Sequence, residues 1–164
     1  MLLAVGLLLA VGINAQKIIM KIQGVTVPEG EEIQAFDWKN TSPYPDGSIG
    51  GGGGGYGKAD PGLIMVKKAV DKSTNKLMVQ LAKAIVLPEE LIFEFYANNT
   101  DKDPYYRIRC QHAVVKQFYY LAPECPTCIK LVHQVGFSPG ETVKFENLLT
   151  GETNTWNIAE NTTQ

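Results

Sequence analysis

Hydrophobic and polar residues alternate in short runs along most of the chain after residue 16. In Lys17–Gln23 every second residue is apolar, so one face of the segment is hydrophobic and the other is polar. A period of two residues is typical of a half-buried β-strand. The same pattern predicts further strands at 32–39, 62–68, 91–96, 105–120, 129–137 and 143–149, with a short closing segment at 156–158.

The longest of these segments, 105–120, loses its alternation at Ala113–Val115, which predicts a β-bulge or a kink there. Before that point its apolar face carries Cys110 and His112, and the apolar face of 129–137 carries His133. Both histidines are therefore expected to point inward. A lone histidine in such a position is more often a satisfied core group than a catalyst.

One stretch has the period of a helix. Asp71–Asn75 offers several side chains that can cap the unpaired amides of a helix start, and Pro88 marks the end. Between them, apolar residues at helical spacing predict one stripe that faces the core. The stripe consists of Leu77, Met78, Leu81, Ala84 and Ile85. With one helix among many short strands, the chain is predicted to be an all-β sandwich or a small barrel.

Composition narrows the class of protein. The chain has 164 residues, of which 45% are hydrophobic and 20% are charged, as expected for one globular domain. Its formal net charge is -2, and no block of like charges stands out. This charge gives no electrostatic basis for binding nucleic acid or an anionic membrane. The aromatic residues also follow no basic track that would suit a single-stranded nucleic acid.

Residues 1–15 are uncharged and apolar, unlike the rest of the chain. The segment is too short to span a bilayer, which needs roughly 20 residues. Its length suits the core of a signal peptide, and Ile13-Asn-Ala15 is an acceptable cleavage site. We therefore expect residues 1–15 to be a signal peptide and 16–164 to be a single secreted domain, free of the membrane after cleavage. A buried N-terminal strand or a retained anchor is the alternative.

A glycine-rich loop separates the predicted strands that end at 39 and begin at 62. It contains Gly50, Gly51, Gly52, Gly53, Gly54 and Gly55, followed by Tyr56 and Lys58. The stretch 52–58 formally fits the phosphate-binding pattern G-x-x-x-x-G-K. However, Ala59 stands where a Ser or Thr must ligate magnesium, and no helix follows. The loop joins two strands of one domain, and because glycine is costly to order, it is either flexible or held in place by something else.

Three cysteines are present, at 110, 125 and 128. Cys110 falls in the apolar register and is expected to be a small buried residue. Cys125 and Cys128 form a C-x-x-C in a loop beside Glu124, a neighbour that disfavours a reactive thiolate. A disulfide between Cys125 and Cys128 is the expected arrangement in an exported protein. A thiol function or a zinc site, which would need Cys110 and a histidine as further ligands, is the alternative.

Catalytic groups do not come together in the sequence order. No Ser/His/Asp set and no close pair of carboxylates can be assembled, so the sequence predicts a protein that is not an enzyme and holds no cofactor or metal. Acceptor sites for N-glycosylation begin at Asn40, Asn98 and Asn161, and they matter only in a eukaryotic host.

Five segments of the chain are distinctive when they are taken in order. They are the opening strand Lys17–Ile22, the segment Ala35–Trp38, the glycine run that closes on Gly57-Lys58, the helix entry Val70–Leu77, and Trp156–Asn161. The glycine-rich loop and the Asp-Lys-Ser-Thr helix entry are fairly specific together, in this order and spacing. Over nearly the whole chain after residue 17, these segments resemble the Hcp family, the tube proteins of bacterial type VI secretion systems.

The resemblance implies two antiparallel sheets that form a small β-barrel, with one flanking α-helix. It implies a structural subunit that forms homohexameric rings, which stack into a hollow tube, carry small effectors and are themselves expelled. Its partners would be copies of itself, with secretion-apparatus proteins and effectors beyond them. In this family the loop between the second and third strands, here Asn40–Pro61, contacts neighbouring subunits. Gly50–Gly55, Tyr56 and Lys58 are therefore the expected interface residues.

Two other hypotheses stand beside this one. The chain would be a secreted monomeric β-domain that binds a small ligand or a protein through its glycine-rich loop, or a thiol or zinc protein that uses Cys125 and Cys128. Particle size separates a tube subunit from a monomeric domain. Metal content and a count of free thiols test the third hypothesis.

Overall fold

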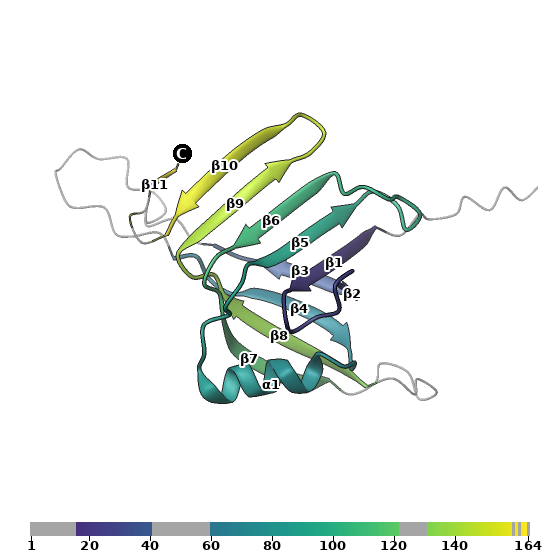
Figure 1. Ribbon diagram of the computed structural model, residues 1–164, viewed down its shortest axis with the longest axis vertical. Coiled ribbons are helices and arrows are strands. Elements are labelled where there is room, and N and C mark those ends of the chain that lie inside the picture. Colours follow the sequence, from purple (N-terminus) through teal and green to yellow (C-terminus); the bar gives the residue numbers. More distant parts are fainter. Residues whose placement is uncertain (1–15, 41–59, 122–130, 159, 161, 164) are drawn as a thin grey trace, which may run out of the picture.

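The strands of the protein form two antiparallel sheets (Figure 1). The computed structural model describes residues 16–40, 60–121, 131–158, 160, 162 and 163. In this part, sheet A contains, in spatial order, β11 (Thr162–Thr163), β10 (Glu152–Asn157), β9 (Thr142–Asn147), β6 (Tyr106–Cys110), β5 (Leu91–Tyr96), β1 (Lys17–Ile22) and β2 (Glu31–Ile33). Sheet B contains β3 (Ala35–Trp38), β4 (Ile64–Ala69), β8 (Val132–Ser138) and β7 (Val114–Leu121), and the helix α1 (Thr74–Lys83) packs against β7.

Aromatic side chains join the two sheets across the core. Phe36 of β3 meets Phe93 and Phe95 of β5 edge to face, with ring centroids 4.9 and 5.2 Å apart. Trp38, at the end of β3, stacks on Phe145 of β9 at 5.7 Å. Such ring pairs stabilise the fold beyond the burial of their apolar area. The predicted fold class, a mainly β domain of two antiparallel sheets with one flanking helix, is confirmed.

Two segments that were predicted as single strands each divide between the sheets. The first, 32–39, leaves sheet A after β2, bends at Gln34 and enters sheet B as β3. Gln34 N donates to Lys67 O of β4 at 2.7 Å, so the backbone stays hydrogen-bonded at the bend. The prediction was wrong because period-two alternation continues through a change of sheet.

The second divided segment, 105–120, runs from β6 in sheet A to β7 in sheet B through a turn at residues 111–113. The lost alternation at 113–115 therefore marks the passage between sheets, and a bulge follows within β7. His112 lies in the turn with a φ of 54°. Its side chain is exposed, contrary to prediction, and its Nδ1 lies 2.6 Å from Glu141 Oε2.

Backbone hydrogen bonds hold this turn against the loop that carries the chain from β8 in sheet B back to β9 in sheet A. Glu141 N donates to Gln111 O at 3.1 Å, and Gln111 N donates to Thr142 O at 3.0 Å. Gly140 lies so near the turn that a Cβ atom on it would be 2.0 Å from His112 O. Real Cβ atoms essentially never approach within 3.0 Å, so this position requires glycine.

The predicted helix is present, but its end and its buried face differ from the prediction. It ends at Lys83, before Pro88, because Ala84 takes a left-handed conformation with a φ of 49°. The short helix buries only the residues nearest the sheet, and the end of the predicted stripe lies beyond it. Of that stripe, Leu77 is buried and Leu81 half-buried, whereas Met78, Ala84 and Ile85 are exposed.

The strands β8 and β9 are confirmed with shifted ends. β8 begins at Val132, and its inward face buries His133, as predicted. β9 ends at Asn147, so Leu148 and Leu149 belong to the turn before β10 and not to a strand. This turn gives the molecule an exposed apolar tip.

Replacement of Gly140 by alanine is expected to lower the free energy of unfolding by about 1–3 kcal/mol, as overpacking usually does. The new methyl group and His112 O cannot both keep their positions. Thermal or urea unfolding of the purified variant measures the loss. Gly151→Ala is the control, because a Cβ there meets no atom within 4 Å and only the strain of a φ of 78° remains. Equal losses in the two variants would contradict the steric explanation.

Candidate functional site

The side chains that the sequence singled out for contact or pairing are not part of what the structure describes. The predicted interface residues, Gly50–Gly55 with Tyr56 and Lys58, and the predicted disulfide pair, Cys125 and Cys128, lie outside the described residues and stay predictions. Cys110 is described and is fully buried, as predicted. Burial raises the pKa of its thiol to about 12, so it is chemically inert at neutral pH.

A buried ion cluster lies where the helix begins. Lys68 of β4 has no exposed surface, and its ammonium group lies 2.6 Å from each of three oxygens: Glu31 Oε2 of β2, Asp71 Oδ2 and Ser73 Oγ. An ammonium group has three donors, so this buried charge is fully hydrogen-bonded. Because Glu31 belongs to sheet A and Lys68 to sheet B, the cluster joins both sheets and the helix entry at one point.

The helix entry is built around Asp71. Ser73 occupies the N-cap position, but its hydroxyl makes no capping bond and lies instead 2.6 Å from Glu31 Oε2 in the cluster. Asp71 Oδ1 accepts from Ser73 N at 3.0 Å, and Thr74 Oγ1 accepts from Asp71 N at 3.0 Å. Burial alone would raise the pKa of Asp71. Hydrogen bonds from Lys68 and Ser73 outweigh it and lower the pKa, so the carboxylate stays ionised.

His133 of β8 is the cross-strand neighbour of Lys68. Its ring is fully buried, stacks on Phe118 with centroids 4.7 Å apart, and meets Tyr120 edge to face. Neither ring nitrogen has a hydrogen-bond partner among the described residues. Burial, assisted by the charge of Lys68, lowers the pKa of the imidazole to about 4. At neutral pH the ring is therefore an uncharged part of the core, as expected, although its nitrogens are not satisfied.

A network of charged side chains covers the outer face of sheet A. Glu94 of β5 is buried and pairs with Lys21 of β1 at 2.7 Å and with Arg107 of β6 at 2.8 Å. Arg107 and Arg109 both reach Glu146 of β9, at 3.4 and 3.0 Å. Opposite charges on adjacent strands stabilise a sheet in one register. The network therefore fixes the alignment of four neighbouring strands.

The pKa values of these groups move away from neutral pH. Burial alone would raise the pKa of Glu94, but hydrogen bonds from Lys21, Arg107 and Tyr96 outweigh it and lower the pKa. Burial and the hydrogen bond that its hydroxyl donates to Glu94 raise the pKa of Tyr96 to about 12. A general acid or base works best with a pKa near the operating pH. The network thus suits a structural role and not proton transfer.

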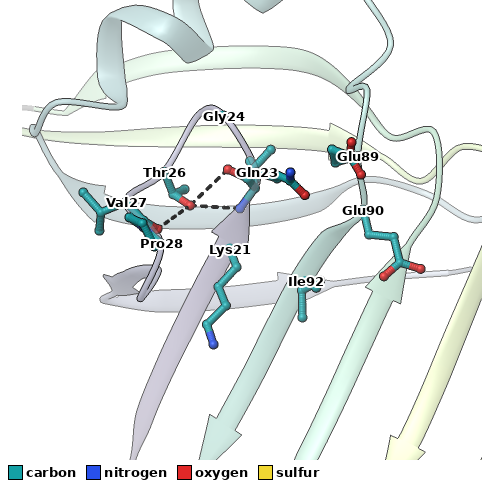
Figure 2. A pocket seen from close by; sticks show the side chains of 10 residues that line it. Lys21, Gln23, Gly24, Thr26, Val27, Pro28, Glu89, Glu90 and Ile92 are labelled. Carbon is teal, nitrogen blue, oxygen red and sulfur yellow. Dashed lines mark hydrogen bonds between the residues drawn. The ribbon is translucent and has the colours of Figure 1, made fainter.

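A cavity of about 570 Å³ opens beside the end of β1 and the turn that follows it (Figure 2). The Thr26 hydroxyl is turned back toward β1, where it donates to Ile22 O at 3.1 Å and accepts from Ile22 N at 3.0 Å. Lys21 and Glu90 also line the cavity, but both are engaged in ion pairs of the charged network. Glu89 is the remaining charged residue of the lining.

Metal-binding residues are dispersed over the described part of the chain. No three His, Cys, Asp or Glu side chains gather there as a metal site would require. Of the ligands nominated for zinc, Cys110 is buried in sheet A, His112 is exposed beside Glu141, and His133 is stacked within sheet B. Among the same residues, no helix has the length and apolar character needed to cross a membrane.

Apolar side chains are exposed at several places on the molecule, and two of these places lie far apart. At the turn between β9 and β10, Leu149 is 78% exposed. The turn lies at the top of Figure 1, whereas α1 lies at the bottom. On and just after α1, four apolar side chains are 37–47% exposed, namely Met78, Val79, Ile85 and Val86.

Two packed antiparallel sheets with one flanking helix define a small, mainly β domain. The profile of a protein family described as "Type VI secretion system effector, Hcp" matches residues 24–146, well over half of the chain. The chain belongs to this family, the Hcp proteins of type VI secretion. The resemblance seen in the sequence is thereby confirmed.

Solved structures show the same fold. A type six secretion system protein superposes with a TM-score of 0.75 at 16% identity, over 92% of this chain and 100% of that chain. Hcp1 from Salmonella typhimurium superposes with a TM-score of 0.69 at 14% identity, over 92% of this chain and 100% of that chain. The secreted protein Hcp3 from Pseudomonas aeruginosa superposes with a TM-score of 0.62 at 12% identity, over 87% of this chain and 98% of that chain. No curated protein matches the chain.

Membership of this family makes the chain a structural subunit of a type VI secretion tube. The family proteins assemble with themselves into rings and tubes and are secreted through that system. Neither the monomeric binding domain nor the thiol or zinc protein is favoured by the family or by the similar structures.

The buried cluster was missed in the sequence, although one signal pointed to it. In the strand 64–69, Lys68 shares the alternating face of Ile64 and Val66, so a lysine occupies a buried register. Asp71, three positions later, is within reach of a lysine side chain. The contact with Glu31 could not be predicted, because only the folding of distant strands brings Glu31 close to Lys68.

Replacement of Lys68 by methionine is expected to lower the free energy of unfolding by about 3–5 kcal/mol. The substitution would leave the carboxylates of Glu31 and Asp71 without their counter-ion. Denaturant unfolding measures the loss. Lys39→Met is the matched control, since Lys39 and Asp37 are exposed and 3.9 Å apart, and its effect should stay within about 0.5 kcal/mol. A Lys68 variant as stable as this control would show that the cluster does not stabilise the fold.

The stability of the wild-type chain should fall as the pH drops from 6.5 toward 4. In the unfolded chain His133 binds a proton with its ordinary pKa of 6.5, whereas the folded ring resists protonation down to about 4. The difference between these two pKa values corresponds to about 3 kcal/mol in the free energy of unfolding. This stability is fully present above pH 6.5 and is lost by about pH 4. His133→Phe keeps a ring to stack on Phe118 and should remove this dependence. Urea midpoints at pH 7 and 4.5 test it, and equal losses in both proteins would refute it.

Proposed function

We propose that this chain forms homohexameric rings that stack into a hollow tube, and that the tube carries small effectors. The observation that supports the proposal most directly is the match of the family profile over residues 24–146, together with a fold shared over nearly the whole chain. The role is mechanical. The subunit needs a fixed shape and contact surfaces, and catalytic groups play no part in it.

The distribution of exposed apolar residues supports a ring. A closed ring of more than two identical subunits needs a heterologous contact, in which two different surfaces of the subunit meet. The patch at α1 and the apolar turn between β9 and β10 are two such surfaces, at opposite ends of the molecule in Figure 1. Tyr119 and Tyr120, both about half exposed, add apolar surface on β7, an outer strand of sheet B.

Export of the chain rests on its N-terminal segment. Residues 1–15 have the length and composition of a signal peptide, with cleavage after Ala15. The mature subunit would then begin at Gln16, directly before β1. In this arrangement the glycine-rich loop, with Tyr56 and Lys58, contacts the neighbouring subunits.

Native mass spectrometry of the full chain, expressed in a bacterium with a general export pathway, tests both parts of this proposal. The exported protein should appear as a hexamer of chains that begin at Gln16, and electron microscopy should show rings. A mature chain that stays monomeric at high concentration would refute ring formation. An exported chain that keeps residues 1–15 would refute cleavage without touching the ring.

A further inference from the structure

The turn between β9 and β10 holds an exposed leucine on a well-ordered backbone. Asn147 Oδ1 accepts hydrogen bonds from Leu149 N at 3.1 Å and Thr150 N at 3.2 Å, and Gly151 N donates to Asn147 O at 2.8 Å. Leu149 projects from this closed turn as the most exposed large hydrophobic residue of the described part. Turn residues are usually small and polar. A leucine fixed at the tip is thus a contact group held ready before binding.

A small, open cavity lies at the other end of the molecule, beside α1. It has a volume of about 270 Å³ and lies between the helix and the turn that follows β1. Most of its surface is apolar, and Val79, nearly half exposed, stands on its helical side. The lining residues are Gly24, Val25, Asn75, Lys76, Val79 and Gln80.

The charges around the two surfaces are complementary. α1 contains no acidic residue, and Lys76, which lines the cavity, is exposed and donates to Gly24 O at 3.0 Å. Lys83 adds a second exposed positive charge at the end of the helix. Glu152, directly after the apolar turn, is exposed and negatively charged. Complementary charges steer two surfaces together and disfavour wrong pairings.

The turn and the cavity lie at opposite ends of the long axis in Figure 1, so one copy cannot bring its own two surfaces together. We propose that Leu149 of one copy of the chain seats in the cavity beside α1 of the next copy. The proposal rests on the proposed function, because it identifies one contact between subunits of the assembly. Such a head-to-tail contact repeats from copy to copy, and it closes into a ring or extends a stack depending on the rotation between copies.

The first test is truncation of the apolar tip. Leu149→Ser, in the mature chain, should weaken the association of subunits about 10- to 100-fold, as expected when the burial of one leucine is lost. Sedimentation velocity over a range of concentrations measures the change. Leu149 is exposed, so the variant should unfold at the wild-type temperature. Leu131→Ser removes another exposed leucine, 43% exposed, that neither belongs to the turn nor lines the cavity, and it should associate like the wild type.

The second test uses the fact that two different surfaces meet. Val79→Lys blocks the cavity but leaves Leu149 intact, whereas Leu149→Ser leaves the cavity intact. Each variant alone should assemble poorly. An equal mixture should form one-to-one pairs, because the tip of one variant still fits the cavity of the other, but no larger particles.

The outcomes separate this contact from the wider proposal. If the wild-type chain does not assemble, both the ring and this contact fail. If the wild type assembles and each variant assembles as well as the wild type does, the ring stands and the contact is overturned. Poor assembly by each variant, with no pairs in the mixture, also overturns it, since the two surfaces then do not meet each other.

Discussion

A lysine ammonium group without contact to water needs oxygen atoms around it as hydrogen-bond acceptors, and this requirement organises one end of the molecule. Lys68 meets it with Glu31, Asp71 and Ser73, which come from the other sheet and from the helix entry. The three contacts are directional, so they fix where β2 lies against β4 and where α1 begins. A buried ion pair contributes little net stability compared with an apolar replacement, but it tolerates no loss of one partner. Its main consequence here is geometry.

The same chemistry recurs on the outer face of sheet A, where Glu94 and Glu146 are each held by two or more cations. Both carboxylates have lowered pKa values, and the pKa of Tyr96, which donates to Glu94, is raised to about 12. None of these groups changes charge near neutral pH. A subunit that must present the same shape in every copy of a tube gains from such a network, because its strand register does not vary with modest changes of pH.

Alternation in the sequence was enough to predict most strands and the fold class, because one face of each strand is buried. Alternation does not show which sheet a strand joins, and the prediction failed at such points. The segment 32–39 keeps its period of two while it passes from one sheet to the other at Gln34. Helical spacing likewise could not show that only Leu77 and Leu81 of the stripe are covered, because the sheet that covers them is built from distant segments. Ala84 and Ile85 lie beyond the helix, which ends at Lys83. The partner of Lys68 on β2 was also hidden, since distant strand pairing is not written in local periodicity.

The helix entry that carried the family resemblance is also the segment that surrounds Lys68. Its Asp and Ser are therefore explained by the needs of a buried charge, and they place α1 against β7 with the apolar cavity at its side. At the opposite end, Asn147 closes the turn that presents Leu149. Both surfaces are thus ordered by contacts within the subunit before any partner arrives. Association then loses little conformational entropy, and a contact of modest area can be effective when it repeats around an assembly.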